Sequence, residues 1–342
     1  MNERRVPAEI LTGLSLDILK AVGVDDEPAS ATTAAMMHAS FHGVDSHGIR
    51  LLPFYADSVR KGICKPNPKI AVTYPRRSAA HVDADDGLGH LPTYRAMDEA
   101  CAIAREAGIG MAVVVNSTHF GAAGAYTLAA AEAGFIGFAT CNSGAFVASF
   151  GGKKPQHGTN PISLAAPRKG GEPFLLDMAT SAVPWNKVMR YRTEGLALPS
   201  DVALDGDGRY TGDPAKAVCL GPLGGAQFGY KGAGLAGMAE VLGGALTGMR
   251  LGTEQSGITL GDTKVGHFVM AIDPQTFIAE ALFGERIAAY LDSFAREPGT
   301  MPAGGPEWAN RRNREANGIP LPDGLYMELK AAADTAGVPF SP

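Results

Sequence analysis

The middle of the chain alternates short apolar runs with longer helix-like segments, and this alternation restricts the fold more than any other feature. Residues 110–115 (GMAVVV) and 267–272 (HFVMAI) have the length and composition of buried strands. Residues 91–107 and 122–133 have the length of helices. Because strands that alternate with helices build α/β domains, we predict an α/β domain over residues 75–272.

Both ends of the chain have a helical pattern instead. Residues 7–22 place their apolar side chains on one helical face. Residues 273–297 predict one long helix, begun by an Asp-Pro pair. A chain of 342 residues is long enough for two domains. We therefore predict that residues 1–74 and 273–342 together form a second, mainly helical domain.

The composition excludes several classes of partner. The formal net charge is −5 and no Lys/Arg-rich stripe is present, so neither nucleic acid nor an anionic membrane surface is expected to bind. No apolar run reaches the roughly 18 residues of a membrane span, and the start of the chain lacks the pattern of a signal peptide. The four cysteines are far apart and form no CxxC pair. These features predict a cytoplasmic protein without a disulfide framework.

The segment HGVDSHGIRLLPFY contains the strongest local candidate for catalysis. His47 lies between Ser46 and a glycine at the end of a helical block, where its ring can point into a cleft and exchange protons near neutral pH. Arg50 and Tyr55 follow, and an arginine fork fits a carboxylate. The structural alternative is that His47 caps a helix and Arg50 is a solvated surface charge.

A metal site is the other chemistry that this segment suggests. His38 and His42 have the i, i+4 spacing of metal ligands, and His47 follows. No HExxH pattern completes such a site, and Asp45 is the one acid nearby. We therefore predict no metal here, although a metal-dependent hydrolase remains an alternative to test.

Two further segments suggest a ligand cleft. His119 follows the GMAVVV strand, at the point where α/β proteins place ligand-binding groups, although a histidine in a loop is commonly structural. Asp177 ends a short strand in LDMATS. That acid either belongs to a capping arrangement or binds a ribose hydroxyl.

Residues Gly232, Gly234 and Gly237 match the GxGxxG dinucleotide fingerprint, but their context does not. They follow a loop rather than a strand and lie late in the chain, so we reject a Rossmann domain. Their helix start still offers free N–H groups to a phosphate, with Lys231 adding charge. The alternative is close packing of a helix rich in small residues.

Taken together, the motifs resemble one family. SHG with LLPFY, NSTHFGAAGAY, GTNPISLAAP, DMATS, GYKGAG and HFVMAIDP occur in the order seen in the type-2 malate/L-lactate dehydrogenase family. That family includes ureidoglycolate dehydrogenase, sulfolactate dehydrogenase, diketogulonate reductase and Δ1-piperideine-2-carboxylate reductase. The resemblance implies a non-Rossmann, L-sulfolactate dehydrogenase-like fold: a central mixed-sheet domain that binds NAD or NADP and a helical domain from both termini. It also implies a homodimer with the active site near the interface.

The resemblance assigns roles to individual residues. His47, with Ser46 beside it, and His119 are both candidates for the proton donor, and the choice between them stays open. The positions that match cofactor contacts are Ser143, Thr159, Asp177, Met178, Ala179, Lys231, Gly232 and Gly304, the last in a loop that closes over the cofactor.

The chain departs from the family pattern at two positions. The family often has an arginine four residues after the SHG histidine, where this chain has Leu51, which puts the carboxylate contact of Arg50 in doubt. The imine-reductase branch carries an acid near the position of Lys187. This lysine is itself a candidate to bind the substrate or to polarise a carbonyl.

The sequence therefore predicts an NAD(P)-dependent enzyme that transfers a hydride between nicotinamide and a small 2-oxo or 2-hydroxy acid. The main alternative is reduction of a cyclic imino acid such as Δ1-piperideine-2-carboxylate or Δ1-pyrroline-2-carboxylate. A ligand-binding homologue without activity is a third possibility. The expected partners are the small carboxylic acid and a second copy of the chain.

Overall fold

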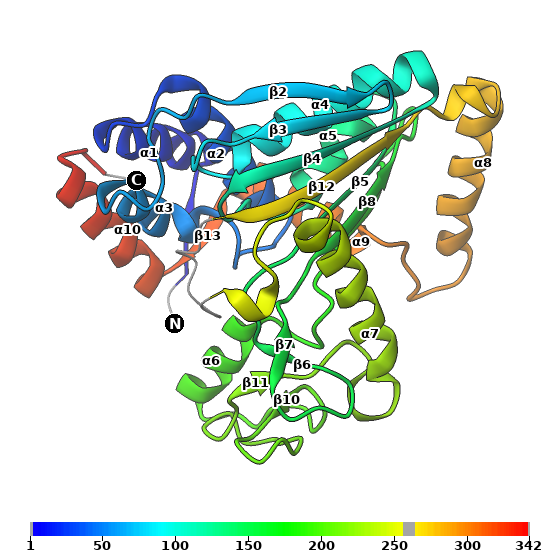
Figure 1. Ribbon diagram of the computed structural model, residues 1–342. Helices are drawn as coiled ribbons and strands as arrows, with labels where there is room; N and C mark the ends of the chain where they lie inside the picture. Colours follow the sequence, from blue (N-terminus) through cyan, green and yellow to red (C-terminus); the bar gives the residue numbers. More distant parts are fainter. Residues whose placement is uncertain (1–2, 256–263, 341–342) are drawn as a thin grey trace.

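The apolar runs in the middle of the chain form the centre of a seven-stranded sheet. The computed structural model describes residues 3–255 and 264–340, and the strand order in this sheet is β2-β3-β4-β12-β5-β8-β9. β4 (Ile109–Ser117) and β12 (Val265–Ile272) pair antiparallel at its centre, whereas β3 (Ala79–Asp83) and β4 run parallel. The predicted α/β fold class with a mixed sheet is confirmed (Figure 1).

Helices α4 (His90–Ala107) and α5 (Gly124–Glu132) pack on this sheet. Fully buried small residues, such as Ala100 of α4 and Ala139 of β5, let the helices approach the strands closely. β2 contains Pro75, which the edge position of that strand tolerates because no neighbour needs its N–H group. The remaining strands of the sheet are β2 (Ala71–Arg76), β5 (Ile136–Cys141), β8 (Ile162–Ala166) and β9 (Phe174–Met178).

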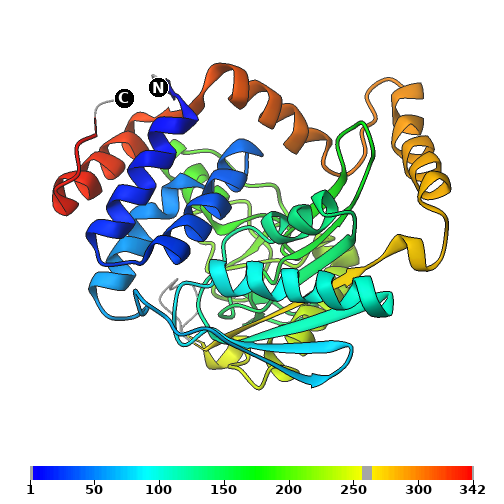
Figure 2. The ribbon, with the colours of Figure 1, turned by 90° about the horizontal axis from the view of Figure 1, so that it is seen from above.

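Helices from the two ends of the chain pack side by side, as Figure 2 shows. Leu11, Leu52 and Leu329 belong to one buried cluster that draws on both ends. A short antiparallel ladder between β1 and β13 also joins the first described residues to the last third of the chain. The elements of this region are β1 (Glu3–Val6), α1 (Ala8–Ala21), α2 (Asp26–Phe41), η1 (Ile49–Leu51), α3 (Leu52–Arg60), α9 (Gly305–Asn317), β13 (Ile319–Pro322) and α10 (Asp323–Ala336).

The segment after β12 differs from the predicted single helix over residues 273–297. The carboxylate of Asp273 accepts the backbone N–H of Gln275 and caps the short turn η4 (Pro274–Thr276). The chain then extends at Ala279, with a ψ of 139°, so α8 (Glu280–Ser293) begins six residues later than η4. α8 is followed by η5 (Phe294–Arg296) and lies at the far edge of the molecule, away from α1 and α10 (Figures 1 and 2).

A smaller lobe lies below the sheet in Figure 1 and includes residues 195–230. Four short strands form a sheet there, in the order β10-β11-β6-β7. Val188, Leu198 and Leu220 are buried in its own hydrophobic cluster. Its elements are β6 (Val147–Ala148), β7 (Pro155–His157), α6 (Trp185–Glu194), β10 (Ala203–Leu204), β11 (Cys219–Leu220), α7 (Gly225–Glu240), η2 (Val241–Ala245) and η3 (Gly252–Glu254).

Candidate active site

His119 lies where the chain crosses from β4 to α5, and two contacts define the state of its ring. Nδ1 lies 3.3 Å from the backbone N of Gly121, which donates, and 2.7 Å from the hydroxyl oxygen of Tyr55. An N–H group has no acceptor role, so Nδ1 carries a lone pair and the proton of the neutral ring is on Nε2. Nε2 has no hydrogen-bond partner among the described residues. It is the atom available to a ligand.

His47 stacks on His119. The ring centroids are 5.5 Å apart and the planes are inclined by 17°. His47 lies in the loop between α2 and η1, and its Nδ1 is 2.8 Å from the hydroxyl oxygen of Ser46. Burial lowers the pKa of His47 to about 4. Burial and the neighbouring histidines also hold the pKa of His119 well below its usual range, so both rings are neutral at pH 7.

Both histidines line one cavity of about 370 Å³, a size typical of small-molecule sites. The wall combines residues of the terminal helical region, the central sheet and the small lobe. The predicted site residues that line it are Ser46, His47, His119, Ser143, Thr159, Asp177, Met178 and Ala179. Within the described lining no residue is a lysine or arginine, and Asp177 is the one carboxyl group.

Asp177 connects the cavity to the start of α5. Its Oδ2 accepts the backbone N–H of Gly124 at 2.9 Å, in the first turn of that helix. Asp177 therefore caps α5, a helix that precedes it in the sequence. The spacing of residues around Asp177 could not predict this partner. Burial raises the pKa of Asp177 to about 6 despite this hydrogen bond. The other oxygen, Oδ1, takes no part in this hydrogen bond and is available for a ribose hydroxyl.

The lining fits a dinucleotide in chemical character. Ser143 and Thr159 offer hydroxyl groups, and Asp177 offers a carboxylate, which are the groups that bind ribose hydroxyls and amides. Phe146 and Trp185 add flat apolar surface, which suits an aromatic ring. Sequence reasoning missed these two aromatic residues, although Trp185 lies two positions before Lys187, which it did single out.

Glu240 is a second residue that sequence reasoning missed. Its carboxylate accepts Nδ2 of Asn142 and Nδ2 of Asn160, each at 3.1 Å, and the backbone N–H of Gly252 at 2.5 Å. These three residues belong to separate segments, and Asn142 lines the cavity. Glu240 therefore holds the cavity wall together. No sequence motif marks it, because its partners lie far away in the chain.

The cavity lining does not include four of the predicted contacts, Arg50, Tyr55, Lys187 and Gly304. Arg50 is exposed on η1, whereas the next residue, Leu51, lines the cavity. Lys187 is partly buried on α6 with its Nζ over the ring of Tyr191, 5.9 Å from the centroid. Gly304 is the N-cap residue of α9, with a φ of +89°, and is packed against Leu175 of β9.

The helix start predicted at Gly232 is wrong, whereas the cofactor contact of Lys231 and Gly232 stays a prediction. α7 begins at Gly225, so Gly232 lies in the third turn, where its N–H group bonds within the helix. A Cβ at Gly232 would lie 2.4 Å from the carbonyl oxygen of Leu223. Close packing therefore explains this glycine, and Lys231 is exposed on the helix surface.

The three histidines of the metal alternative do not converge. The rings of His38 and His42 are 4.2 Å apart, and His42 contacts the edge of Trp308. His47 instead stacks on His119. In the described ranges, no group of three or more His, Cys, Asp or Glu side chains is placed to hold a metal ion.

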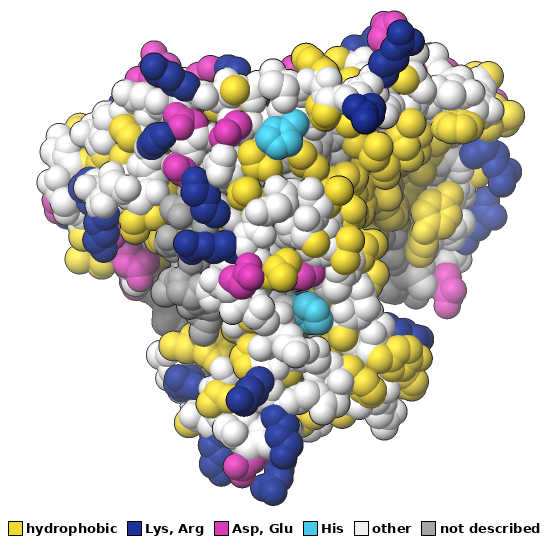
Figure 3. Space-filling model, viewed as in Figure 1, with side chains coloured by type: hydrophobic (Ala, Val, Ile, Leu, Met, Phe, Trp, Pro, Cys, Tyr) yellow, Lys and Arg dark blue, Asp and Glu magenta, His cyan; other side chains and the backbone are white. Residues whose placement is uncertain are grey.

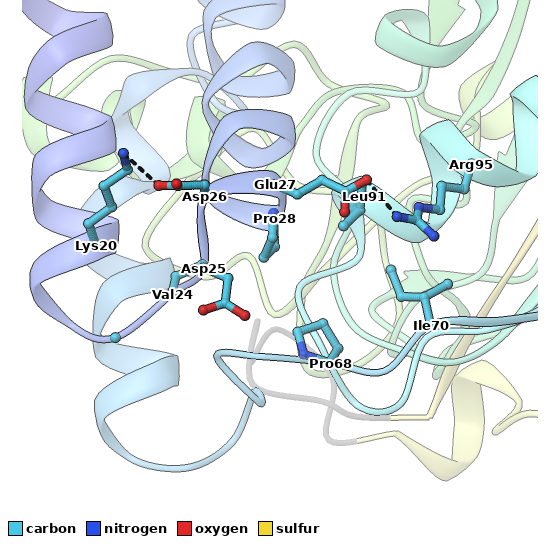
Figure 4. Close-up of a pocket in the computed structure, with 11 residues that line it drawn as sticks. Lys20, Val24, Asp25, Asp26, Glu27, Pro28, Pro68, Ile70, Leu91 and Arg95 are labelled. Atoms are coloured by element: carbon cyan, nitrogen blue, oxygen red, sulfur yellow. Dashed lines mark hydrogen bonds and ion pairs between the residues drawn. The ribbon is translucent and has the colours of Figure 1, made fainter.

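A second, more open depression lies between the α1–α2 turn and α4, and Figure 4 shows its residues. Both of its cations are already paired, Lys20 with Asp26 and Arg95 with Glu27. Its lining contains no histidine, cysteine or serine. The histidine-lined cavity is therefore the candidate active site.

The comparisons with known proteins agree with this geometry. The chain is 38% identical over 297 residues to malate dehydrogenase of Pyrococcus horikoshii, which covers 85% of this chain and 82% of that one. It is 35% identical to (2R)-3-sulfolactate dehydrogenase (NADP(+)) of Chromohalobacter salexigens, over 94% and 95% of the two chains. The solved Δ1-piperideine-2-carboxylate reductase of Pseudomonas syringae superposes with a TM-score of 0.87 at 28% identity, over 96% and 100% of the chains.

The family model described as malate/L-lactate dehydrogenase matches residues 6–330. This match includes the segments that carry both histidines, Asp177 and the helices of both ends. The chain belongs to the malate/L-lactate dehydrogenase family.

Proposed function

We propose that His119 is the proton donor and acceptor in hydride transfer between a nicotinamide cofactor and a small 2-oxo or 2-hydroxy acid. The chain is an NAD(P)-dependent oxidoreductase of this class, as its family and relatives indicate. The observation that carries the assignment is the Gly121 N–H group on Nδ1, since it directs the ring proton to the free Nε2. The bound nicotinamide supplies or accepts the hydride.

The lack of a cationic side chain in the described cavity lining suggests how the acid binds. A 2-oxo acid is an anion, yet the described lining contains no lysine or arginine. We infer that His119 takes up a proton as the anion enters, because a nearby negative charge raises the pKa of a histidine. Tyr55 then accepts from Nδ1, since a hydroxyl group can both donate and accept. Nε2–H can then give its proton to the carbonyl oxygen in reduction.

The remaining contacts stay proposals. We assign Ser46 and His47 to the substrate side of the cavity. We assign Ser143, Thr159, Asp177, Met178 and Ala179 to its cofactor side, and all of these residues line the cavity. Lys187 remains a candidate for the substrate carboxylate, because Trp185 and Asn186 just before it line the cavity. NAD and NADP are both open.

We propose that the chain works as a homodimer with the active site near the interface. Large apolar side chains are exposed on α7 and just after it, which is unusual for a surface that meets only water. Figure 3 shows hydrophobic side chains gathered between α8 and the body of the molecule. Large apolar residues are exposed on α7, directly after it and just before α8, and include Phe228, Leu235, Val241, Leu246 and Phe277. Light scattering on a gel-filtration peak measures the mass directly.

We expect the protein to work in the cytoplasm. All four cysteines are buried free thiols, which suits a reducing compartment. In the described ranges, no helix has the length and hydropathy needed to cross a membrane.

The test follows the absorbance of the reduced cofactor with NADH and with NADPH. The panel contains pyruvate, oxaloacetate, 3-sulfopyruvate, oxalurate and Δ1-piperideine-2-carboxylate, the last for the imine-reductase alternative that the Pseudomonas relative supports. His119→Asn should lower kcat by about 10²–10⁴-fold, the usual share of a general acid. His47→Asn should act mainly on the KM of the acid. A kcat that survives His119→Asn and is lost with His47→Asn would reverse the assignment.

A further inference from the structure

α9 lies behind the loop that carries Ser46 and His47, although the two segments are far apart in sequence. Trp308 contacts the ring of His42 edge-on, with the centroids 5.1 Å apart. The side chain of Asn310 occupies the space beside Gly43, where a Cβ would lie 2.5 Å from Nδ2. Gly43 has a φ of +78°, so both its backbone and its packing require glycine.

Arg314 makes the polar contacts between α9 and this loop. Its Nη2 donates to Oδ2 of Asp45 at 3.0 Å, and its Nη1 donates to Oδ1 of the same carboxylate. Nη1 also donates to the carbonyl oxygen of Ser40 at 2.5 Å. The side chain of Arg314 is 8% exposed, whereas that of Asp45 is 55% exposed. A buried guanidinium with a two-point partner has little freedom to move.

Ser40 extends this contact to the other end of the loop. Its hydroxyl oxygen accepts the backbone N–H of Ile49 at 2.9 Å. The N–H of His47 donates to the carbonyl oxygen of Val44 at 2.9 Å. Arg314 therefore holds Ser40 before the turn of His47 and Asp45 within it. Through Ser40 it also holds Ile49 after the turn.

The other end of α9 is attached to the cofactor side of the cavity. Nε1 of Trp308 donates to the carbonyl oxygen of Pro173 at 3.0 Å, just before β9. Trp308 also packs in one cluster with Leu175 of β9. Figure 2 shows α9 running from the side of α8 to the helices of both ends. One helix thus connects the strand that ends at Asp177 and Met178 to the loop of His47.

We propose that Arg314 is a positioning residue that holds His47 against His119 through Asp45, and so sets the binding geometry of the substrate. The inference rests on the proposed function, because it assigns the substrate side to Ser46 and His47. Arg314 touches neither cavity nor ligand, since it is absent from the described lining. Its effect must therefore act through the loop.

The test compares Arg314→Met, Arg314→Lys and Asp45→Asn with the control Arg312→Met. Arg312 is also on α9, but its recorded partner is Glu172 on the surface. Arg314→Met should lower kcat/KM for the acid by about 100-fold, the cost of a misplacement of about 1 Å. The KM of the cofactor should stay at its original value. Lysine should restore part of the loss, because an ammonium contacts one oxygen but cannot form the fork.

Asp45→Asn keeps the shape of an exposed side chain, so it should fold and show a smaller loss in the same direction. The double variant of Asp45 and Arg314 should show no additional loss, because the two residues share one contact. An unchanged kcat/KM in Arg314→Met would overturn the proposal. So would an equal rise in the KM of the acid and the KM of the cofactor together with a lower Tm.

Amide hydrogen exchange gives a readout that needs no activity. The N–H groups of His47 and Ile49 should exchange faster in Arg314→Met and at the original rate in Arg312→Met. A wild type without turnover on any acid would defeat the proposed function, and the exchange rates would still test the positioning. Equal rates in Arg314→Met and the wild type would overturn it.

Discussion

The hydroxyl oxygen of Tyr55 lies 2.7 Å from Nδ1 of His119, although the two residues are 64 positions apart. Tyr55 is buried on α3, and burial holds the pKa of its phenol well above the usual range. The phenol therefore stays protonated at all working pH values. It can donate to the neutral ring and accept from the charged one, which suits a histidine that changes its charge in each cycle.

Tyr55→Phe removes this partner and keeps the ring. We expect kcat to fall about tenfold, the equivalent of one hydrogen bond of about 1.4 kcal/mol, and the pH profile of kcat to shift. Tyr126→Phe is the matched control, because the Tyr126 hydroxyl group donates to the carbonyl oxygen of Phe120 and to no histidine of the described ranges. Equal effects of both variants on kcat would show that loss of stability, not the contact with His119, is responsible.

Proton uptake by His119 predicts opposite pH dependences for the two directions. The pKa of His119 is far below 7 in the free protein, so every productive complex with an oxo acid must take a proton from water. We expect log kcat/KM for reduction to fall by about one per pH unit between roughly pH 6 and 9. Oxidation needs the neutral ring in the tautomer that reduction leaves, with the proton on Nδ1 toward Tyr55 and the lone pair on Nε2. Its rate should therefore rise over the same range or stay level. A flat profile for reduction would mean that the proton comes from elsewhere.

Asp177 predicts a pH dependence of stability. Its pKa is raised from 3.8 to about 6 in the folded protein, so the folded state binds the proton more tightly than the unfolded state. The associated stability is fully present below about pH 4 and is lost as the pH rises through 6, by about 2–3 kcal/mol in total. Asp177→Asn should flatten the dependence of Tm on pH in this window. The same variant should raise the KM of the cofactor, measured at pH 7.

Two glycines of α7 distinguish close packing from phosphate binding. A Cβ at Gly232 would strike the backbone of Leu223, whereas a Cβ at Gly234 would meet nothing within 4 Å. Gly232→Ala should therefore lower the Tm. Gly234→Ala should raise stability by about 0.5–1 kcal/mol, because alanine is the better helix residue. Neither change should alter the KM of the cofactor selectively, and a selective rise in Gly234→Ala would revive the fingerprint interpretation.

Local sequence patterns were sufficient for the elements of the sheet and for half of the site. The GMAVVV and HFVMAI runs became β4 and β12 because apolar residues of this spacing have no stable place outside a core. The glycine beside His47 and the strand before His119 marked both histidines as cavity residues. These signals are local, so they can be interpreted without knowledge of the tertiary structure.

Contacts between distant segments could not be predicted in this way. The helix start predicted at Gly232 was wrong because α7 begins seven residues earlier, at Gly225. The packing of Gly232 on Leu223 depends on the small lobe. The long helix over residues 273–297 was wrong because one side-chain cap at Asp273 closed a separate turn. A sequence motif specifies neither a side-chain cap nor a contact with a distant segment of the chain.

The sequence by itself determined the family, the α/β class and the two histidines, because each depends on short motifs with their own physical requirements. Only the tertiary structure decided which ring nitrogen of His119 is free, which helix Asp177 caps and what holds the loop of His47. Each of these depends on two groups, up to 274 residues apart, meeting at hydrogen-bond distance. Packing of the whole chain sets such distances, and no local pattern encodes them.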